Sequence, residues 1–263
     1  MFHEPSPQFF YSSYRIIIEH SDGVNSVTSS ATAFILEVAK GIPWIVTNRH
    51  VIDLNYNQSS NKFRHFKPSK VLIIGRDLSD NEYSYELYEK AEFFYHGERE
   101  NDVVMIESRV MNSVKPFHWH FGLEHLADDK IFETVLPFDL ICFTGFPKTH
   151  DKYKNRPILR SGRIASDPKF EYSWNNEYQG QCVAYEGFSS SGASGSPVFA
   201  PSRGLQTIPN SRHGYLVGVN AGHIPDQYGH SGISYFYKST VILEIIEQNS
   251  LDKKLTPRDT KEH

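Results

Sequence analysis

Hydrophobic residues along the chain gather in short segments, and turn residues separate these segments from one another. The segments are rich in β-branched and aromatic side chains, and Asp22-Gly23 and Lys40-Gly41 are two of the turns between them. The predicted strands cover residues 14–19, 32–38, 44–47, 70–75, 84–94, 102–107, 140–145, 157–164, 181–185, 196–200, 215–220 and 233–238. Many short strands with no long amphipathic helix between them indicate an all-β sandwich or a pair of barrels.

One helix is predicted near the end of the chain. Apolar residues recur at helical spacing from Val241 to Ile246, and Ser239 or Thr240 precedes them as an N-cap. The residues that follow Ser250 are mostly charged, so we expect a frayed, solvated tail there.

The two halves of the predicted β-structure meet between residues 118 and 129. No stretch rich in glycine, serine or proline marks a linker at this point, so we expect the halves to pack tightly together. We divide the chain into an N-terminal half over residues 1–122, a C-terminal half with its helix over residues 123–250, and a charged tail over residues 251–263.

Composition narrows the class of protein and the partners. The chain has 263 residues, of which 39% are hydrophobic and 22% are charged, which is an ordinary globular balance. A net charge of -4 does not favour a nucleic-acid or membrane partner. The only cysteines are Cys142 and Cys182, and neither a leader pattern nor a continuous apolar span is found. These features predict a cytoplasmic protein in a reducing compartment, although one bridge between the two cysteines stays open.

Three short motifs carry candidate chemistry, and each adjoins a predicted strand. In Trp44-Ile-Val-Thr-Asn-Arg-His50, a histidine lies in the turn after a strand. In Asn101-Asp102-Val-Val, an aspartate opens an apolar strand. In Ser191-Gly-Ala-Ser194-Gly-Ser-Pro, a serine lies between two glycines in a turn that leads into a strand.

These residue types belong together in nucleophilic catalysis. A serine hydroxyl needs a base within hydrogen-bond reach, and a carboxylate on the far ring nitrogen holds an imidazole in the tautomer that can serve. We therefore predict the catalytic residues His50, Asp102 and Ser194. The flanking glycines let the turn aim the N–H groups of Gly192 and Ser194 at a developing oxyanion, which predicts an oxyanion hole. This chemistry calls for no cofactor and no metal.

The order histidine, aspartate, serine, with these flanking residues, resembles the trypsin-like serine peptidases of the chymotrypsin fold. The style is that of the bacterial cytoplasmic and HtrA-like branch, and residues 142–147 and 157–166 resemble its second barrel. The resemblance extends over roughly residues 10 to 248. It implies two six-stranded antiparallel barrels with a C-terminal helix. It also places the catalytic residues in the cleft between the barrels, with His50 and Asp102 from the first and Ser194 from the second.

The chain departs from the family pattern directly before the nucleophile. Members that are activated by cleavage carry an aspartate at this position, and it pairs with the new N-terminus. Here the residue is Ala193, so we expect no activation by that ion pair. The site is then either formed from the start or controlled by another partner.

The resemblance also locates the substrate pocket. Its walls are predicted to be Phe188, Ser189, Ser190, Ser191, Asn220, Ala221, Gly222 and Gly232. Phe188 falls at the base of this pocket, from which we expect a preference for an uncharged, apolar side chain over lysine or arginine. The strand at 219–222 should offer its backbone edge to an extended substrate.

Two other groups of residues are candidate functional sites, a set of histidines and the two cysteines. His118, His120 and His125 are close in sequence and could bind a metal, but no matching cysteine or carboxylate motif accompanies them. Cys142 and Cys182 lie outside the nucleophile turn and are expected to be small buried residues, which disfavours a cysteine peptidase.

Two classes of function follow from the sequence. The first is a serine endopeptidase that hydrolyses peptide bonds of a peptide or protein substrate through an acyl-enzyme. The second is a latent or inactive module of the same fold that senses or tethers a protein partner. The complete set of three residues favours the first, whereas the missing activation carboxylate keeps the second open.

Overall fold

The computed structural model describes residues 7–39, 41–56, 61–87, 91–108, 117–204 and 211–253. Two expectations from the sequence, a leader-free N-terminus and a frayed tail, fall largely on residues 1–6 and 254–263, which lie outside these ranges. None of the described helices is both long and apolar enough to cross a membrane.

The N-terminal half is built from one antiparallel sheet. Its strands are β1 (Ser13–Ser21), β2 (Ser26–Ala39), β3 (Ile42–Thr47), β4 (Lys67–Arg76), β5 (Glu82–Glu86), β6 (Phe93–Tyr95), β7 (Val104–Glu107) and β8 (Phe121–Gly122). The order is β5-β4-β1-β2-β3-β7-β6, and β8 pairs with β2 in parallel. Over the described residues the ladder runs through seven strands without closing and β8 is an eighth strand beside β2, which differs from the closed barrel of six that the resemblance implies.

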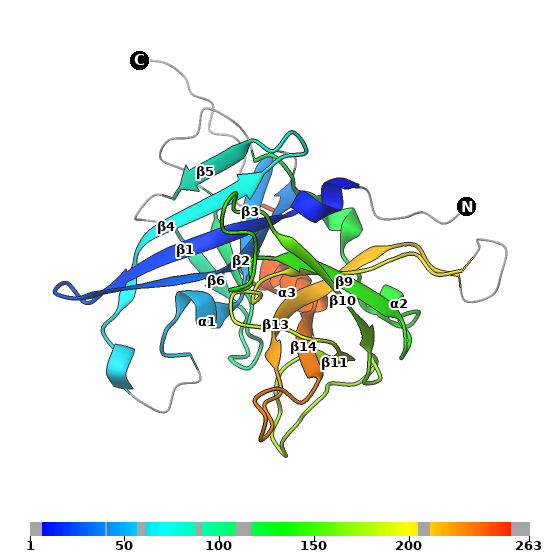
Figure 1. The fold of residues 1–263 in the computed structure, drawn as a ribbon. Helices are drawn as coiled ribbons and strands as arrows, with labels where there is room; N and C mark the ends of the chain where they lie inside the picture. The colour runs from blue at the N-terminus through cyan, green and yellow to red at the C-terminus, as the bar shows by residue number, and fades with distance from the viewer. Residues whose placement is uncertain are drawn as a thin grey trace.

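The C-terminal half is a closed six-stranded barrel. Its strands are β9 (Leu140–Gly145), β10 (Ile158–Ile164), β11 (Cys182–Glu186), β12 (Pro197–Ala200), β13 (Tyr215–His223) and β14 (Ile233–Lys238). They close in the order β10-β11-β14-β13-β12-β9. In Figure 1 these green to orange strands lie beside the blue and cyan strands of the first half.

Helices are short except at the C-terminal end. α1 (Arg49–Ile52) follows β3, and α2 (Asp129–Phe132) precedes β9 in the C-terminal half. The three remaining elements are short 3₁₀ helices, η1 (Pro7–Tyr11), η2 (Asn61–Phe63) and η3 (Leu123–His125). α3 (Thr240–Asn249) confirms the predicted helix, and its apolar face is buried. Ser239 stands at the N-cap, but its hydroxyl donates to the Ala127 carbonyl and not to the helix.

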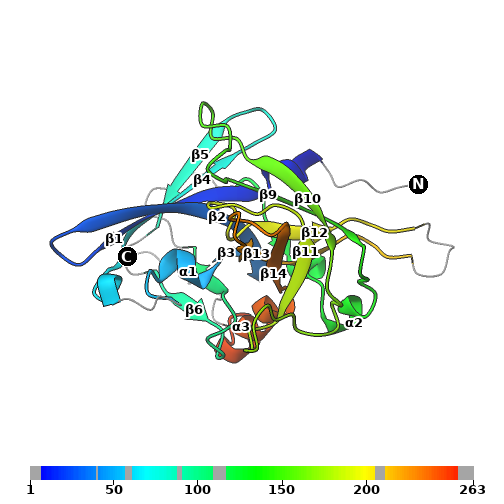
Figure 2. The same ribbon diagram turned by 60° about the horizontal axis from the view of Figure 1, so that its bottom comes forward.

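A single buried cluster joins the two halves. It contains Trp44 and Met105 from the first half, Val219 and Tyr237 from the second, and the buried side of α3. Figure 2 shows α3 beneath both groups of strands. Burying this shared apolar surface is favourable at about 25 cal/mol per Å². The halves therefore pack without a linker, as the sequence predicted.

Every segment predicted as a strand overlaps a strand of the structure. The segment 84–94 holds two strands, β5 and β6, and residues 88–90 between them lie outside the described ranges. The prediction missed β8, α1 and α2, which are two to four residues long. Elements of that length carry too few residues for a hydrophobic period to show.

Candidate active site

His50 and Asp102 form a close pair in the first half. β3 ends at Thr47, and the single turn of α1 carries His50 away from the sheet. Asp102 lies just before β7, which is the neighbour of β3. One carboxylate oxygen is 2.5 Å from His50 Nδ1, and the other accepts the His50 backbone N–H at 2.8 Å. The carboxylate thus fixes both the ring and the backbone of the histidine.

The surroundings of the pair set its charge and exposure. The Asp102 side chain is only 6% exposed, and its main-chain carbonyl accepts a hydrogen bond from the Asn48 amide at 2.7 Å. The His50 side chain is 36% exposed, so its outer edge faces the cleft. Burial lowers the pKa of His50, but the charge and hydrogen bond of Asp102 outweigh it and raise the pKa above the ordinary 6.5. An imidazolium formed here is therefore stabilised.

Ser194 lies in a tight turn that precedes β12. Gly192 and Gly195 on either side of it have φ angles of 97° and 84°, which side chains disfavour. A Cβ on Gly195 would lie 1.9 Å from the Thr32 carbonyl oxygen, and one on Gly192 would lie 2.5 Å from that of Phe146. Both glycines are required by the path of the backbone, as the sequence motif suggested.

Thr32 of β2 holds this turn from the other half of the molecule. Its backbone N–H donates to the Ser194 carbonyl at 2.9 Å, and its hydroxyl donates to the Gly192 carbonyl at 2.8 Å. The same hydroxyl oxygen accepts the backbone N–H of Phe146 at 2.9 Å. One residue of the first sheet therefore fixes two peptide groups of the nucleophile turn.

The remaining peptide groups of the turn are also oriented. The Ser191 carbonyl accepts from the Lys148 N–H, and the Ala193 carbonyl accepts from the Asn220 side chain. In a trans peptide the following N–H points the opposite way. The N–H groups of Gly192 and Ser194 consequently point away from these bonds, and neither has a hydrogen-bond partner among the described residues. Two such free donors could stabilise an oxyanion.

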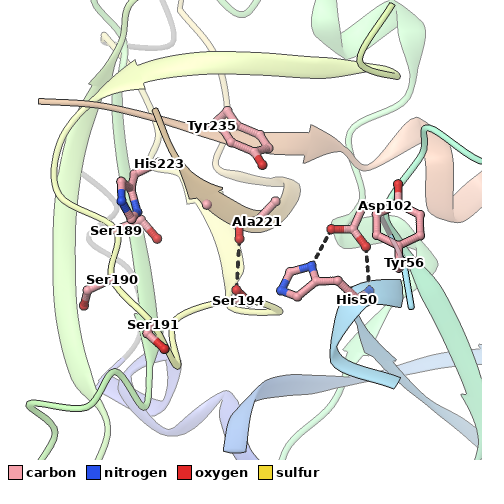
Figure 3. Close-up of a pocket in the computed structure, with 11 residues that line it drawn as sticks. His50, Tyr56, Asp102, Ser189, Ser190, Ser191, Ser194, Ala221, His223 and Tyr235 are labelled. Carbon is pink, nitrogen blue, oxygen red and sulfur yellow. Dashed lines mark hydrogen bonds and ion pairs between the residues drawn. The ribbon is translucent and has the colours of Figure 1, made fainter. Parts of the chain in front are cut away.

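The Ser194 hydroxyl itself does not reach His50. It donates to the carbonyl of Ala221 at 2.9 Å, and Ala221 is bulged out where β13 leaves its register with β14. Figure 3 shows the His50 ring between the Asp102 carboxylate and Ser194, with the serine hydroxyl turned toward Ala221. A rotation about the Ser194 side-chain bond is needed to bring the hydroxyl to the imidazole.

All three residues line one pocket of about 380 Å³. Its other walls are Tyr56, Ser189, Ser190, Ser191, Ala221, Gly222, His223 and Tyr235. The residues come from α1 and the segment before β7 on one side, and from β13, β14 and the nucleophile turn on the other. The pocket therefore lies between the two halves.

Solved structures show what this arrangement is similar to. An HtrA-type protease, a variant of AlgW with a tripeptide, matches with a TM-score of 0.54 and 13% sequence identity. The chain has a chymotrypsin-like protease fold. The match covers 94% of this chain and 62% of that one, so the chain spans less than two thirds of the protein it matches. No family model and no curated protein matches the sequence.

Only some of the residues predicted for the substrate pocket line it in the structure. Ser189, Ser190, Ser191, Ala221 and Gly222 line it as expected. Phe188 does not, because its side chain is 62% exposed and lines a separate depression on the barrel.

The other two predicted wall residues also lie elsewhere. Gly232 lines the same outer depression as Phe188. Asn220 is fully buried behind the pocket, where its amide donates to Ser189 Oγ and to the Ala193 carbonyl. Phe188 therefore does not form the base of the pocket, and the expectation of an apolar base loses its support.

Sequence reasoning missed three residues of the pocket. His223 directly follows the predicted edge strand at 219–222, so extending that strand by one residue would have found it. Tyr235 lies on β14, and Tyr56 follows α1 with its hydroxyl donating to the Arg99 carbonyl at 2.8 Å. No motif around Tyr56 signals its place.

Ala193, the residue directly before Ser194, has a structural role. Its side chain is 1% exposed and packs in the core of the second barrel. The turn is held by the hydrogen bonds of Thr32 and Asn220 and not by an ion pair.

The two cysteines and the histidines at 118, 120 and 125 do not line the pocket. Cys142 and Cys182 are free and buried, and burial raises the pKa of each thiol to about 12. His120 pairs with Glu37, His125 lies beside Glu124, and His118 stacks on Tyr83. Across the described residues, no three histidine, cysteine or acidic side chains are arranged to hold a metal ion.

Proposed function

We propose that the chain is a serine endopeptidase in which Ser194 is the nucleophile, His50 the general base and Asp102 its partner. The observation that carries the proposal is the His50–Asp102 pair at 2.5 Å in the same pocket as Ser194. The protease fold supports it at the level of architecture. The two unpartnered N–H groups of Gly192 and Ser194 supply the oxyanion hole.

Acylation begins when the Ser194 hydroxyl turns from Ala221 to His50. The Ser194 oxygen attacks the carbonyl carbon of the scissile peptide bond, and its proton passes to His50 Nε2. The electron pair of the carbonyl moves to its oxygen, which the N–H groups of Gly192 and Ser194 stabilise. The carbon–nitrogen bond then breaks, the amine leaves with the proton from His50, and an ester to Ser194 remains.

Deacylation repeats these steps with water. His50 accepts a proton from a water molecule, whose oxygen attacks the ester carbon. The bond to the Ser194 oxygen breaks, the carboxylic acid product leaves, and Ser194 recovers its proton from His50. Asp102 stays ionised and stabilises the imidazolium in both halves of the reaction.

A second function is favoured by one observation. The Ser194 hydroxyl is bonded to the Ala221 carbonyl and not to His50, which is the arrangement of a resting site. A latent module of the protease fold that senses or tethers a protein partner would have such a site. A partner that straightens the bulge at Ala221 would then be its activator.

A fluorophosphonate probe separates the two functions. The probe should form an adduct at Ser194, identified by intact mass and peptide mapping, and the Ser194→Ala variant should not react. Ser69→Ala is the matched control, since this serine bonds the Glu19 carbonyl far from the cleft and should label like the wild type. Absence of an adduct in a folded wild-type protein would leave only the latent module.

The substrate of this proposed enzyme is a peptide or a protein. A regulatory protein partner belongs to the second proposal. The absence of nucleic-acid and membrane partners and the cytoplasmic location stay predictions from the sequence.

A further inference from the structure

His223 is an imidazole without a hydrogen-bond partner at the wall of the pocket. It ends β13, one residue past Gly222, and is half-buried. Among the described residues neither of its ring nitrogens takes part in a hydrogen bond. Its ring stacks on His230 with 4.4 Å between centroids and 10° between planes. The ring is thus held in place while both nitrogens stay available to a ligand.

His230 supports His223 as a neutral ring. Its Nδ1 accepts the Gly232 N–H at 2.9 Å, which places its proton on Nε2, 3.4 Å from Ser234 Oγ. Burial and the neighbouring His223 lower the pKa of His230. The His230 ring also packs on the Phe188 ring, with 4.7 Å between the two centroids. Of the two stacked rings, His223 is the one whose ring nitrogens both lack a hydrogen bond among the described residues.

Serine hydroxyls line the pocket beside this histidine. The oxygen of Ser189 accepts from the Asn220 amide at 2.9 Å, and a side-chain hydrogen bond joins Ser189 to Tyr185. Ser190 Oγ is buried and has no partner. Figure 3 shows Ser189 beside His223 on the side of the pocket opposite His50. The Ser190 hydroxyl and His223 together form a set of donors without partners among the described residues.

The donor set decides which side chain the pocket accommodates. A carboxylate accepts hydrogen bonds only, so it satisfies these donors together. An apolar side chain would leave them unpaired, which is costly in a buried site. A lysine or arginine side chain would find no free carboxylate, because both oxygens of Asp102 are bound by His50.

We propose that this pocket selects substrates with an acidic side chain before the scissile bond, and that His223 is the residue that binds the carboxylate. The inference rests on the proposed peptidase function and names its substrate class. It replaces the apolar preference expected from Phe188, which lies outside the pocket.

Matched peptides test the inference. Four fluorogenic peptides that differ only in Glu, Gln, Leu or Lys before the scissile bond are compared by kcat/KM. Glu and Gln have nearly the same shape, so their ratio isolates the charge. We expect Glu to exceed Gln about 10-fold to 100-fold, since a charge-assisted hydrogen bond contributes about 1.5–3 kcal/mol. Leu and Lys should fall below both.

Substitutions at His223 assign the effect to this residue. His223→Ala should bring the Glu-to-Gln ratio close to one, and Ser194 should still form the fluorophosphonate adduct. His223→Gln keeps a hydrogen-bond donor of similar size. This variant should still cleave the Gln peptide faster than the Leu and Lys peptides. His65→Ala, at an exposed histidine far from the cleft, should keep the wild-type ratio.

The outcomes separate this inference from the proposed function. A Glu preference that disappears in His223→Ala supports it. Labelling at Ser194 with a preference for Leu, Lys or Gln would overturn the inference and leave the peptidase in place. If labelling occurs without turnover, peptide phosphonates with the same four side chains replace the substrates, and their labelling rates must show the same order. A folded protein with no labelling overturns both.

Discussion

The two walls of the cleft differ in how far they are assembled. On the wall of the first half, the His50 ring and backbone both bond to the Asp102 carboxylate, which is itself buried. On the wall of the second half, the backbone around Ser194 is fixed by Thr32, but its hydroxyl is bonded to Ala221. In the first wall the contact between His50 and Asp102 is already formed. In the second wall the Ser194 hydroxyl must still rotate away from Ala221 to reach His50.

For the proposed peptidase, this difference locates the cost of activation in the second wall. Backbone groups that aim at an oxyanion must be oriented before the reaction, and here Thr32 and Asn220 have already oriented them. A serine hydroxyl on the protein surface changes rotamer in picoseconds to nanoseconds. The rotation of Ser194 is therefore a small barrier if the bulge at Ala221 yields to substrate, and a lasting block if it does not.

Removing the base from the complete wall should have the largest effect. We expect His50→Ala to lower kcat by about 10⁶-fold, because Ser194 then has no group to take its proton. Peptide hydrolysis under single-turnover conditions measures this loss. His20→Ala is a poor control because His20 is buried, so the exposed His65→Ala serves instead. A loss of less than 10-fold would mean that another group acts as the base.

Replacing the partner of the base should have the second-largest effect. Asp102→Asn keeps the size of the side chain but donates to His50 Nδ1, which stabilises the wrong tautomer. We expect kcat to fall by about 10⁴-fold while KM changes little. Circular dichroism and thermal unfolding check that the fold is retained. Activity close to that of the wild type would show that the short contact between His50 and Asp102 has no catalytic role.

Removing a hydrogen bond that orients the nucleophile turn should have a smaller effect. Thr32→Val keeps the backbone bond to Ser194 and the β-branched shape, but it removes the hydroxyl that holds the Gly192 carbonyl. We expect kcat to fall by about 10²-fold through displacement of the oxyanion donors. Thr32→Ser restores the hydroxyl and should recover most of the activity. If both variants behave alike, the turn does not depend on this bond.

The pH profile should shift by the smallest amount. Only the neutral imidazole of His50 acts as a base, so kcat/KM falls as the pH drops through its pKa. Asp102 holds that pKa above the ordinary 6.5, which places the acid limb at a higher pH than for an isolated histidine. In Asp102→Asn the residual activity should show this limb at lower pH. An unchanged limb would mean that Asp102 does not control the charge of His50.

The sequence predicted the strands better than it predicted the wall of the pocket, and the three residues of its motifs, His50, Asp102 and Ser194, do line one pocket. Ser194 and its glycines belong to one short motif, and the required backbone angles are local. The pocket wall depends instead on where the chain goes between β13 and β14, which brings His230 against His223. Phe188 illustrates the limit, since a position carried over from the family says nothing of which way the side chain turns.

The strand pairing of the first half was also beyond the sequence. The longer strands could be recognised by their own composition, as the buried Ile16 and Ile18 of β1 show. The pairing of β8 with β2 joins residues more than eighty positions apart over only two residues of strand. Such non-local contacts leave no pattern in either segment, so only the folded structure reveals them.

A crystal structure of the protein after reaction with a fluorophosphonate tests the central claim most directly. The account predicts that the phosphorus is bonded to Ser194 Oγ, that the hydrogen bond to Ala221 is gone, and that one phosphoryl oxygen lies within hydrogen-bond distance of the N–H groups of Gly192 and Ser194. An adduct whose phosphoryl oxygen points away from both N–H groups would contradict it, as would crystals of intact protein in which Ser194 stays unmodified.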